Sequence, residues 1–391
     1  MLTLDKTART ISGNRLVAFR KNYLVAEDDK GIVDQHHNFR GKDIPHIEVR
    51  PDMKINDLVE IYSRSGFNAR QLGEAAKLYR KMVEDDATIC LTIAGAMTPV
   101  GFGGLFKSLI ENGFVDWIVS TGSNLYHEDH FAWNLPVKQG HYEVDDMILY
   151  QKDIVRIRDV YIKGEETLKE QDKIVQKMFE NNKVDKPFTT AEFANWMGKY
   201  SKEHSKYPER SFVVSAYDYD VPLYISTLKD SSLALDLAPL RLANRQFSLD
   251  FVREIIEQAA ILYNSKKAGI VEIGGGVPKN TAQQTGPLLD QILGLGHGGQ
   301  NYIIQITDAR PDTGGLSGAT LQEGKSWGKV KDSHEDVIMV YTDATIAFPV
   351  LCLYVLNNEQ PRKPKRLYKK LGKYYEELSE TYFAKKKLRY K

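Results

Sequence analysis

Short apolar runs alternate with amphipathic stretches through the middle of the 391-residue chain. The runs are bounded by Gly, Thr and Asp, which is typical of short buried strands. Such alternation predicts an α/β fold: a Rossmann-like parallel sheet with helices on both faces and ligands at the carboxyl ends of its strands. The expected strands are residues 89–94, 117–120, 212–216, 222–225, 270–273, 302–306 and 337–341.

Between these runs, apolar residues recur at helical spacing. The first 85 residues are more polar, and we interpret 1–85 as a helical N-terminal extension packed on a catalytic domain at 86–358. Residues 129–164 have an irregular pattern and are expected to form a loop or an inserted hairpin. The expected helices are residues 55–62, 69–83, 102–111, 167–181, 190–200, 248–265 and 286–295.

Composition indicates a folded protein with a large core, because charge is nearly balanced at 53 basic and 52 acidic residues. Two cysteines do not form a disulfide framework, so a reducing, cytoplasmic location is expected. No stretch reaches the roughly 18 apolar residues of a membrane helix, and no basic segment followed by an apolar run begins the chain.

The last part of the chain, residues 359–391, is predicted to be a basic tail helix. Residues 362–391 carry twelve basic residues against three glutamates, and Tyr374, Leu378 and Tyr382 recur at helical spacing. A solvated amphipathic helix explains this better than nucleic-acid binding, since no recognised nucleic-acid motif accompanies the charge.

Glycine-rich turns follow several expected strands, at residues 94–98, 120–124, 274–276 and 313–318. Glycine lets backbone N–H groups approach a pyrophosphate, and a helix N-terminus adds a favourable dipole. Neither a G-x-G-x-x-G fingerprint nor a P-loop occurs, and glycine also serves any tight turn. Four such turns together predict a nucleotide site, with Gly95, Gly122, Gly275, Thr313 and Gly314 among its backbone contacts.

His127 and His130 flank Glu128 and Asp129, which suggests a metal site. The pair lacks a third ligand nearby, so metal binding is disfavoured. A polar loop that offers one carboxylate to a ribose hydroxyl or a substrate amine is the preferred interpretation.

Acidic residues also fall at or just after the expected strand ends. If several converge, the pocket suits a cationic ligand, and Trp327 could add a cation–π contact of about 0.5–2 kcal/mol. Each could instead be a helix cap or a solvated loop residue. These residues are Asp230, Asp236, Asp308, Asp312, Glu323 and Asp343.

Residues 324–329 read Gly-Lys-Ser-Trp-Gly-Lys, and Lys329 is the candidate nucleophile. A lysine near its ordinary pKa of about 10.4 is protonated and inert, so burial or a second cation must lower that pKa. Lys325 could be that cation if the stretch is helical. The alternative is an ordinary solvated loop lysine.

These segments, with Tyr-Thr-Asp-Ala-Thr-Ile-Ala-Phe-Pro at 341–349, make residues 72–353 resemble the deoxyhypusine synthase family. The resemblance implies an NAD-dependent aminobutyl transferase, usually a homotetramer with active sites between paired subunits. It further implies that Lys329 carries an aminobutyl imine, that Trp327 and Glu323 line the polyamine channel and that Asp230 holds the substrate amine. The positions that match NAD contacts are Gly95, Thr98, Thr121, Gly122, Ser123, Glu128 or Asp129, Ser317 and Asp343.

Three positions depart from the family pattern. Asn280 stands where the family has a histidine, Leu316 replaces an aspartate before Ser317, and Asp236 matches the second substrate aspartate only after a one-residue shift. We therefore expect transfer between small polyamines such as putrescine and spermidine, as in homospermidine synthesis. The alternatives are a true deoxyhypusine synthase, which modifies a translation-factor lysine with spermidine, and a non-catalytic NAD or polyamine-binding regulator.

Overall fold

The computed structural model describes residues 42–182, 186–331 and 336–387. The chain forms two compact units, residues 1–48 and 49–391, and the second contains all the helices and strands found in the described residues. The predicted N-terminal extension therefore lies partly outside the described residues. Its boundary at residue 85, like that of the tail at 359, stays a prediction.

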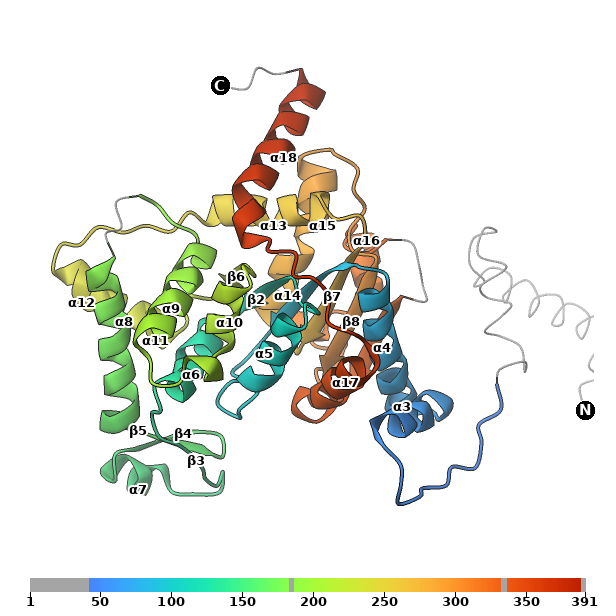
Figure 1. The fold of residues 1–391 in the computed structure, drawn as a ribbon, viewed down its shortest axis with the longest axis horizontal. Helices are drawn as coiled ribbons and strands as arrows, with labels where there is room; N and C mark the ends of the chain where they lie inside the picture. The colour runs from blue at the N-terminus through green and yellow to red at the C-terminus, as the bar shows by residue number, and fades with distance from the viewer. Residues whose placement is uncertain (1–41, 183–185, 332–335, 388–391) are drawn as a thin grey trace, which may run out of the picture. The chain divides into compact units, whose positions relative to one another are not determined.

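A six-stranded sheet in the order β6-β2-β1-β7-β8-β9 forms the centre of the second unit, and all its neighbouring strands are parallel (Figure 1). Strand order runs outward from β1 through β2 to β6, then restarts with β7 on the other side of β1. The β1/β7 junction is thus a topological switch point, where such sheets bind ligands. The strands are β1 (Thr88–Ile93), β2 (Trp117–Ser120), β6 (Leu223–Ile225), β7 (Ala268–Ile273), β8 (Tyr302–Thr307) and β9 (Val337–Tyr341).

Successive side chains on these strands point to opposite faces, and both faces are buried. On β1, Ile89 and Leu91 belong to one hydrophobic cluster, whereas Cys90 belongs to another. The strands therefore read as continuous apolar runs, which explains why the sequence pattern located them well.

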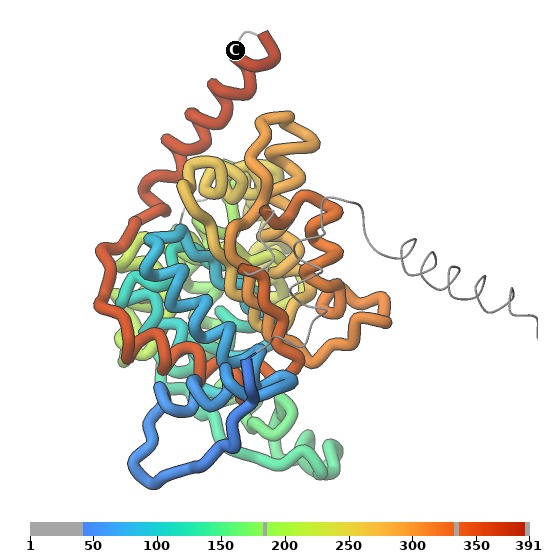
Figure 2. Tube along the Cα trace, turned by 90° about the vertical axis from the view of Figure 1, so that its right-hand side faces the viewer, coloured from blue at the N-terminus to red at the C-terminus, as the bar shows by residue number. Residues whose placement is uncertain are grey.

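Helices cover both faces of the sheet, as predicted. Figure 2 shows α4, α5 and α17 on one side, where α4 and α17 also contact β8. The other face packs on α9, α13, α14 and α16 through residues such as Ala191, Ile261, Ala282 and Leu321. These helices are α4 (Phe67–Glu84), α5 (Gly103–Glu111), α9 (Thr190–His204), α13 (Phe251–Tyr263), α14 (Gly276–Gln283), α16 (Leu321–Ser326) and α17 (Ala344–Asn358), and α3 (Ile55–Arg64) packs on α4 and α17.

A small antiparallel sheet in the order β3-β5-β4 is inserted after α6 (Gly122–Ala132). It consists of β3 (Val137–Gln139), β4 (Ile154–Ile157) and β5 (Val160–Lys163), with α7 (Asp146–Gln151) between β3 and β4. The expected hairpin is confirmed as β4–β5. The expectation for residues 129–132 was wrong, because they continue α6.

The strand predicted at residues 212–216 is wrong, since the segment forms α10 (Phe212–Asp218). The Ser211 hydroxyl accepts hydrogen bonds from the backbone N–H groups of Val213 and Val214, which caps the helix. All five residues are buried. A short apolar run buried on every side has no period that separates strand from helix.

The remaining elements complete the second unit. The tail helix α18 packs on α13, where Leu378 is buried, so one of its faces is not solvated. No helix among the described residues is long and apolar enough to cross a membrane. These elements are η2 (Gly164–Lys169), α8 (Glu170–Asn181), η3 (Pro208–Arg210), α11 (Ser232–Leu235), α12 (Leu237–Leu242), α15 (Thr285–Pro287), η4 (Leu288–Ile292), η5 (Leu316–Gly318), η6 (Tyr368–Lys370) and α18 (Leu371–Lys386).

Candidate active site

Lys329 lines a cavity of about 180 Å³ beside α14 and α16. Its Nζ donates to Oδ1 of Asn280 at 2.9 Å and lies 6.0 Å from the ring centroid of Trp327. Glu323 and Leu316 line the same cavity. The structure thus brings together Lys329, Trp327, Glu323 and Asn280, four of the predicted site residues.

The backbone of Lys329 is held on both sides. Its N–H donates to the carbonyl of Gly324 at 3.0 Å, and its carbonyl accepts from the N–H of Gln300 at 3.0 Å. Gly299, in the left-handed region at φ +73°, leaves room for this approach. Hydrogen bonds on both sides therefore hold the main chain of Lys329 in place.

A second lysine, Lys279 of α14, lines the same cavity and is only 4% exposed. Its Nζ donates to Oε1 of Gln305 at 2.6 Å and to the carbonyl of Ala319 at 2.7 Å. These neutral acceptors fix the ammonium without cancelling its charge. The nearest carboxylate, Oε2 of Glu272, is 4.0 Å away.

Glu272 lies on β7 beneath this cavity and is fully buried. Gln283 Nε2 donates to its Oε1 at 2.6 Å, while Oε2 has no hydrogen-bond partner among the described residues. Burial raises the pKa of Glu272 to about 7, and the nearby Lys279 opposes that rise. A buried carboxyl group and a buried ammonium group thus adjoin the candidate nucleophile.

Burial lowers the pKa of Lys329, and the charge of Lys279 lowers it further. Glu272 and Glu323 act in the opposite direction. The prediction that Lys325 is the second cation was wrong. Because α16 ends at Ser326, Lys329 lies beyond the helix, and residues four apart in sequence are not neighbours on a helix face here. Lys279 occupies that role.

A larger cavity of about 670 Å³ lies at the carboxyl ends of β1, β2, β6 and β7. The predicted residues Gly95, Thr121, Ser123 and Ser317 line it, as does Asp230. Its wall includes Gly276, the first residue of α14, so backbone N–H groups and a helix N-terminus face the β1/β7 switch point. The size, the glycine backbone and the position suit a dinucleotide such as NAD.

The remaining predicted cofactor residues do not line this cavity. Thr98 is buried and donates to the carbonyl of Asn124, and Gly275 packs on Ser317. Asp343 caps α17 by accepting from the N–H of Thr345. Gly122 packs against Ser231, and Thr313 and Gly314 lie in an exposed segment.

Glu128 and Asp129 lie in α6, not in the predicted loop, and both are buried. Glu128 Oε1 accepts from the N–H of Phe212, and Gly103 packs directly on the carboxylate. Because Phe212 and Gly103 begin α10 and α5, this carboxylate lies between two helix N-termini. Burial raises the pKa of Glu128 to about 8.

Asp129 is likewise engaged in the interior, where it accepts from Ser201 at 3.2 Å and from Gln171 at 3.4 Å. Burial lowers the pKa of His127 to about 4 and that of His130 to about 3, so both rings are neutral near pH 7. No group of metal-binding side chains is found among the described residues.

The acidic residues at the strand ends do not converge on one pocket, and the alternative of helix caps and solvated loop residues holds for Asp343, Asp308 and Asp312. Glu323 lines the smaller cavity and Asp230 the larger one, whereas Asp236 is 4% exposed and lines neither. Asp312 pairs with Arg310 at the surface, and Asp308 is exposed. Carboxylates at different strand ends can share an edge of a sheet without sharing a pocket.

Sequence reasoning missed Lys279, Glu272, Gln283 and Gln305. A signal was present, because Glu272 and Gln305 interrupt two strands that are otherwise largely apolar and are buried along their whole length. The two residues are register partners on β7 and β8, so they point to the same face of the sheet. A charged or amide side chain within a buried strand needs partners, and here it indicates the floor of the site.

Fold and site together define a Rossmann-type protein in which a buried lysine and a half-buried lysine line one cavity and a second cavity is large enough for a nucleotide. Residues 57–355 match the deoxyhypusine synthase family model, and the chain belongs to that family. It is 40% identical over 356 residues to a deoxyhypusine synthase-like protein of Nostoc sp., covering 88% of this chain and 92% of the relative. A similarly named Thermosynechococcus vestitus protein is 38% identical, covering 85% and 86%.

A solved structure of a candidate deoxyhypusine synthase from Entamoeba histolytica has a TM-score of 0.52 at 16% identity. It covers 80% of this chain and 96% of its own, which supports the fold. Membership of the family supports an aminobutyl transferase. The family is generally NAD-dependent and oligomeric and acts on polyamines.

Proposed function

We propose that this protein transfers an aminoalkyl group between small amines through an imine on Lys329, with NAD as cofactor. The observation that carries the proposal is the Lys329–Lys279 pair in one cavity, because the second cation favours the free-base form that a nucleophilic amine needs. NAD, when bound in the larger cavity, would oxidise the donor amine and later reduce the product.

The chain's own residues perform the remaining tasks. Asn280 holds the Lys329 amine, which attacks the oxidised carbon of the donor and releases its first amine. The acceptor amine then displaces Lys329. Glu323 is the one carboxylate among the residues that line the smaller cavity, so it would pair with the far ammonium of the donor.

A single carboxylate in a cavity of about 180 Å³ favours a short diamine such as putrescine over a triamine. Each further ammonium of a triamine would need its own carboxylate, yet Leu316 is apolar and Asp236 lies elsewhere. This supports a small-amine reaction, as in homospermidine synthesis, over transfer to a translation-factor lysine.

A closed site also fits this chemistry, since free imines hydrolyse. At the cavity, Trp327 is 60% exposed and Leu316 is 46% exposed. Large apolar side chains that are exposed together often mark a surface that another protein chain covers. We infer that a second subunit of a homo-oligomer, a tetramer by analogy with the family, covers this mouth.

The decisive experiment incubates the protein with NAD and labelled putrescine or spermidine, then adds borohydride. Wild type and Lys325→Ala should retain label, whereas Lys329→Ala should not, and homospermidine should form from putrescine. Label on an added translation factor would support the protein-modifying alternative. NAD binding without any adduct or product would support the non-catalytic regulator and refute the proposal.

A further inference from the structure

The hairpin of the small inserted sheet contributes Arg156, Ile157 and Arg158 to the wall of the larger cavity. Arg156 is already engaged: its Nη2 donates to Oδ2 of Asp146 at 2.8 Å, and its Nη1 donates to the carbonyl of Arg158 at 3.3 Å. The Arg158 guanidinium has no such hydrogen bond or ion pair with the residues that the structure describes. It is therefore a cation available to a ligand of this cavity.

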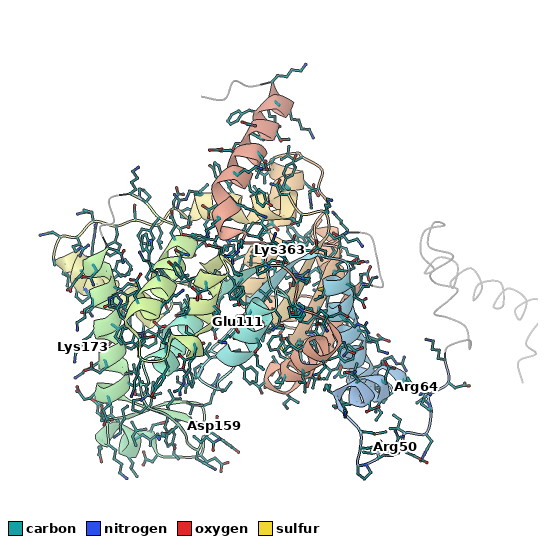
Figure 3. The ribbon with its side chains drawn as sticks, viewed as in Figure 1. Arg50, Arg64, Glu111, Asp159, Lys173 and Lys363 are labelled. Atoms are coloured by element: carbon teal, nitrogen blue, oxygen red, sulfur yellow. The ribbon has the colours of Figure 1, made fainter. Side chains whose placement is uncertain are left out.

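Arg158 also occupies an unusual backbone position. It is the first residue of the two-residue connection between β4 and β5, whose ends Ile157 and Val160 pair across the hairpin. Its φ is 58°, in the left-handed region that glycine and asparagine adopt at less cost. Figure 3 labels the next residue, Asp159, at this turn. The turn alone gives no reason for an arginine, whereas its place beside the cavity does.

The other charged side chain that lines the cavity without a described partner is Asp230, which suits ribose hydroxyls or an amine. The N-terminus of α14 at Gly276 favours an anion in the same space. From the cavity, the unpaired guanidinium and the backbone position, we infer that Arg158 binds the pyrophosphate of the dinucleotide. This inference rests on the proposed NAD site. It adds to that site a phosphate-binding side chain from the inserted sheet.

An arginine binds phosphate oxygens through paired, charge-assisted hydrogen bonds, each worth more than a neutral one. The test is Arg158→Gly, since glycine suits the left-handed turn and should leave the thermal midpoint unchanged or higher. The matched control is Lys138→Ala, which removes one positive charge from an exposed position of the same small sheet, outside the cavity lining.

Calorimetric titration with NAD, ADP-ribose, NADP and adenosine separates the outcomes. For Arg158→Gly we expect Kd for NAD and ADP-ribose to rise about 10- to 100-fold, with adenosine binding unchanged and Lys138→Ala like wild type. An unchanged Kd for NAD overturns the inference, and so does a loss confined to NADP, which would place the 2′-phosphate there instead. Wild type that binds no dinucleotide overturns the cofactor proposal itself, whereas equal NAD binding by wild type and Arg158→Gly overturns only the role of Arg158.

Discussion

The amine of Lys329 donates to the side-chain oxygen of Asn280 at 2.9 Å, and both residues line one cavity. Asn280 carries no charge and so forms no ion pair with Lys329. Its amide oxygen orients the lysine but stabilises the ammonium form less than a carboxylate would. In the proposed mechanism, Asn280 would thus both position the lysine and preserve its reactivity. It also occupies one of the three positions at which the sequence departs from the expected family pattern.

Asn280→Ala should lower kcat about 10- to 100-fold, the loss expected for one hydrogen bond to a reacting amine. KM should change little if Asn280 acts on the lysine and not on bound substrate. Asn280→Asp keeps the shape but adds a negative charge, which should raise the pKa of Lys329 and move the rising limb of the rate profile to higher pH. Equal activity of Asn280→Ala and wild type would contradict this role.

The lysine pair predicts opposite pH shifts from two substitutions. In the proposed mechanism Lys329 reacts as a free base, so its reactivity should rise as pH increases through its pKa. Lys279→Met removes the neighbouring cation, which should raise that pKa and move the rise to higher pH. Glu272→Gln removes an anion, which should lower the pKa and move the rise to lower pH.

The measurement is the rate at which an amine-reactive reagent modifies Lys329 across pH, read by mass spectrometry of its peptide. Lys325→Ala is the control and should not move the profile. Shifts of the same sign for Lys279→Met and Glu272→Gln would show that general disruption of packing, and not charge, controls the lysine.

The sheet was predictable because its strands are buried on both faces and its helices keep a regular apolar period. It was also predictable that one pocket would contain Lys329, Trp327 and Glu323, because they lie within one short segment. Lys279 and Glu272 were not, since β8 and the residues after it separate them from Lys329 in sequence. Only the parallel register of β7 and β8, together with α14, brings these groups together.

Glu128 shows a different limit of sequence reasoning. A polar His-Glu-Asp-His run reads as a surface loop, yet it forms the buried side of α6. The cause is tertiary. The N-terminus of α10 supplies one backbone donor, and the N-terminus of α5 packs against the carboxylate, so the positive ends of two helix dipoles lie beside a residue whose local sequence pattern does not record them.

Glu128 should make stability fall as pH rises. Its folded-state pKa of about 8 exceeds the ordinary 4.5 because burial disfavours the charged form. The folded state therefore holds the proton more tightly, so the stabilisation present at low pH is lost between about 4.5 and 8. Glu128→Gln cannot ionise and should lack this loss.

Urea unfolding of wild type and Glu128→Gln at several pH values between 5 and 8 measures the difference directly. The free energy of unfolding of wild type should fall relative to the variant as pH increases. A difference that is flat, or that rises with pH, would mean that the two helix N-termini stabilise the ionised carboxylate more than burial penalises it.

Gly299 should matter for reaction geometry as well as for stability. A Cβ at this residue would lie 2.5 Å from the carbonyl oxygen of Lys329. A contact this short is a steric clash, so the backbone would have to move. Gly296 is the matched control, because its φ of +72° is close to the +73° of Gly299 and its Cβ would meet nothing within 4 Å.

Both glycine-to-alanine substitutions should cost about 1 kcal/mol for the left-handed backbone. Gly299→Ala should cost more and should also lower the rate of Lys329 modification, because the clash displaces the 3.0 Å hydrogen bond between the Lys329 carbonyl and Gln300. Thermal unfolding and the labelling assay measure the two effects. If Gly299→Ala and Gly296→Ala behave alike in both assays, the main chain of Lys329 does not depend on this contact for its reactive position.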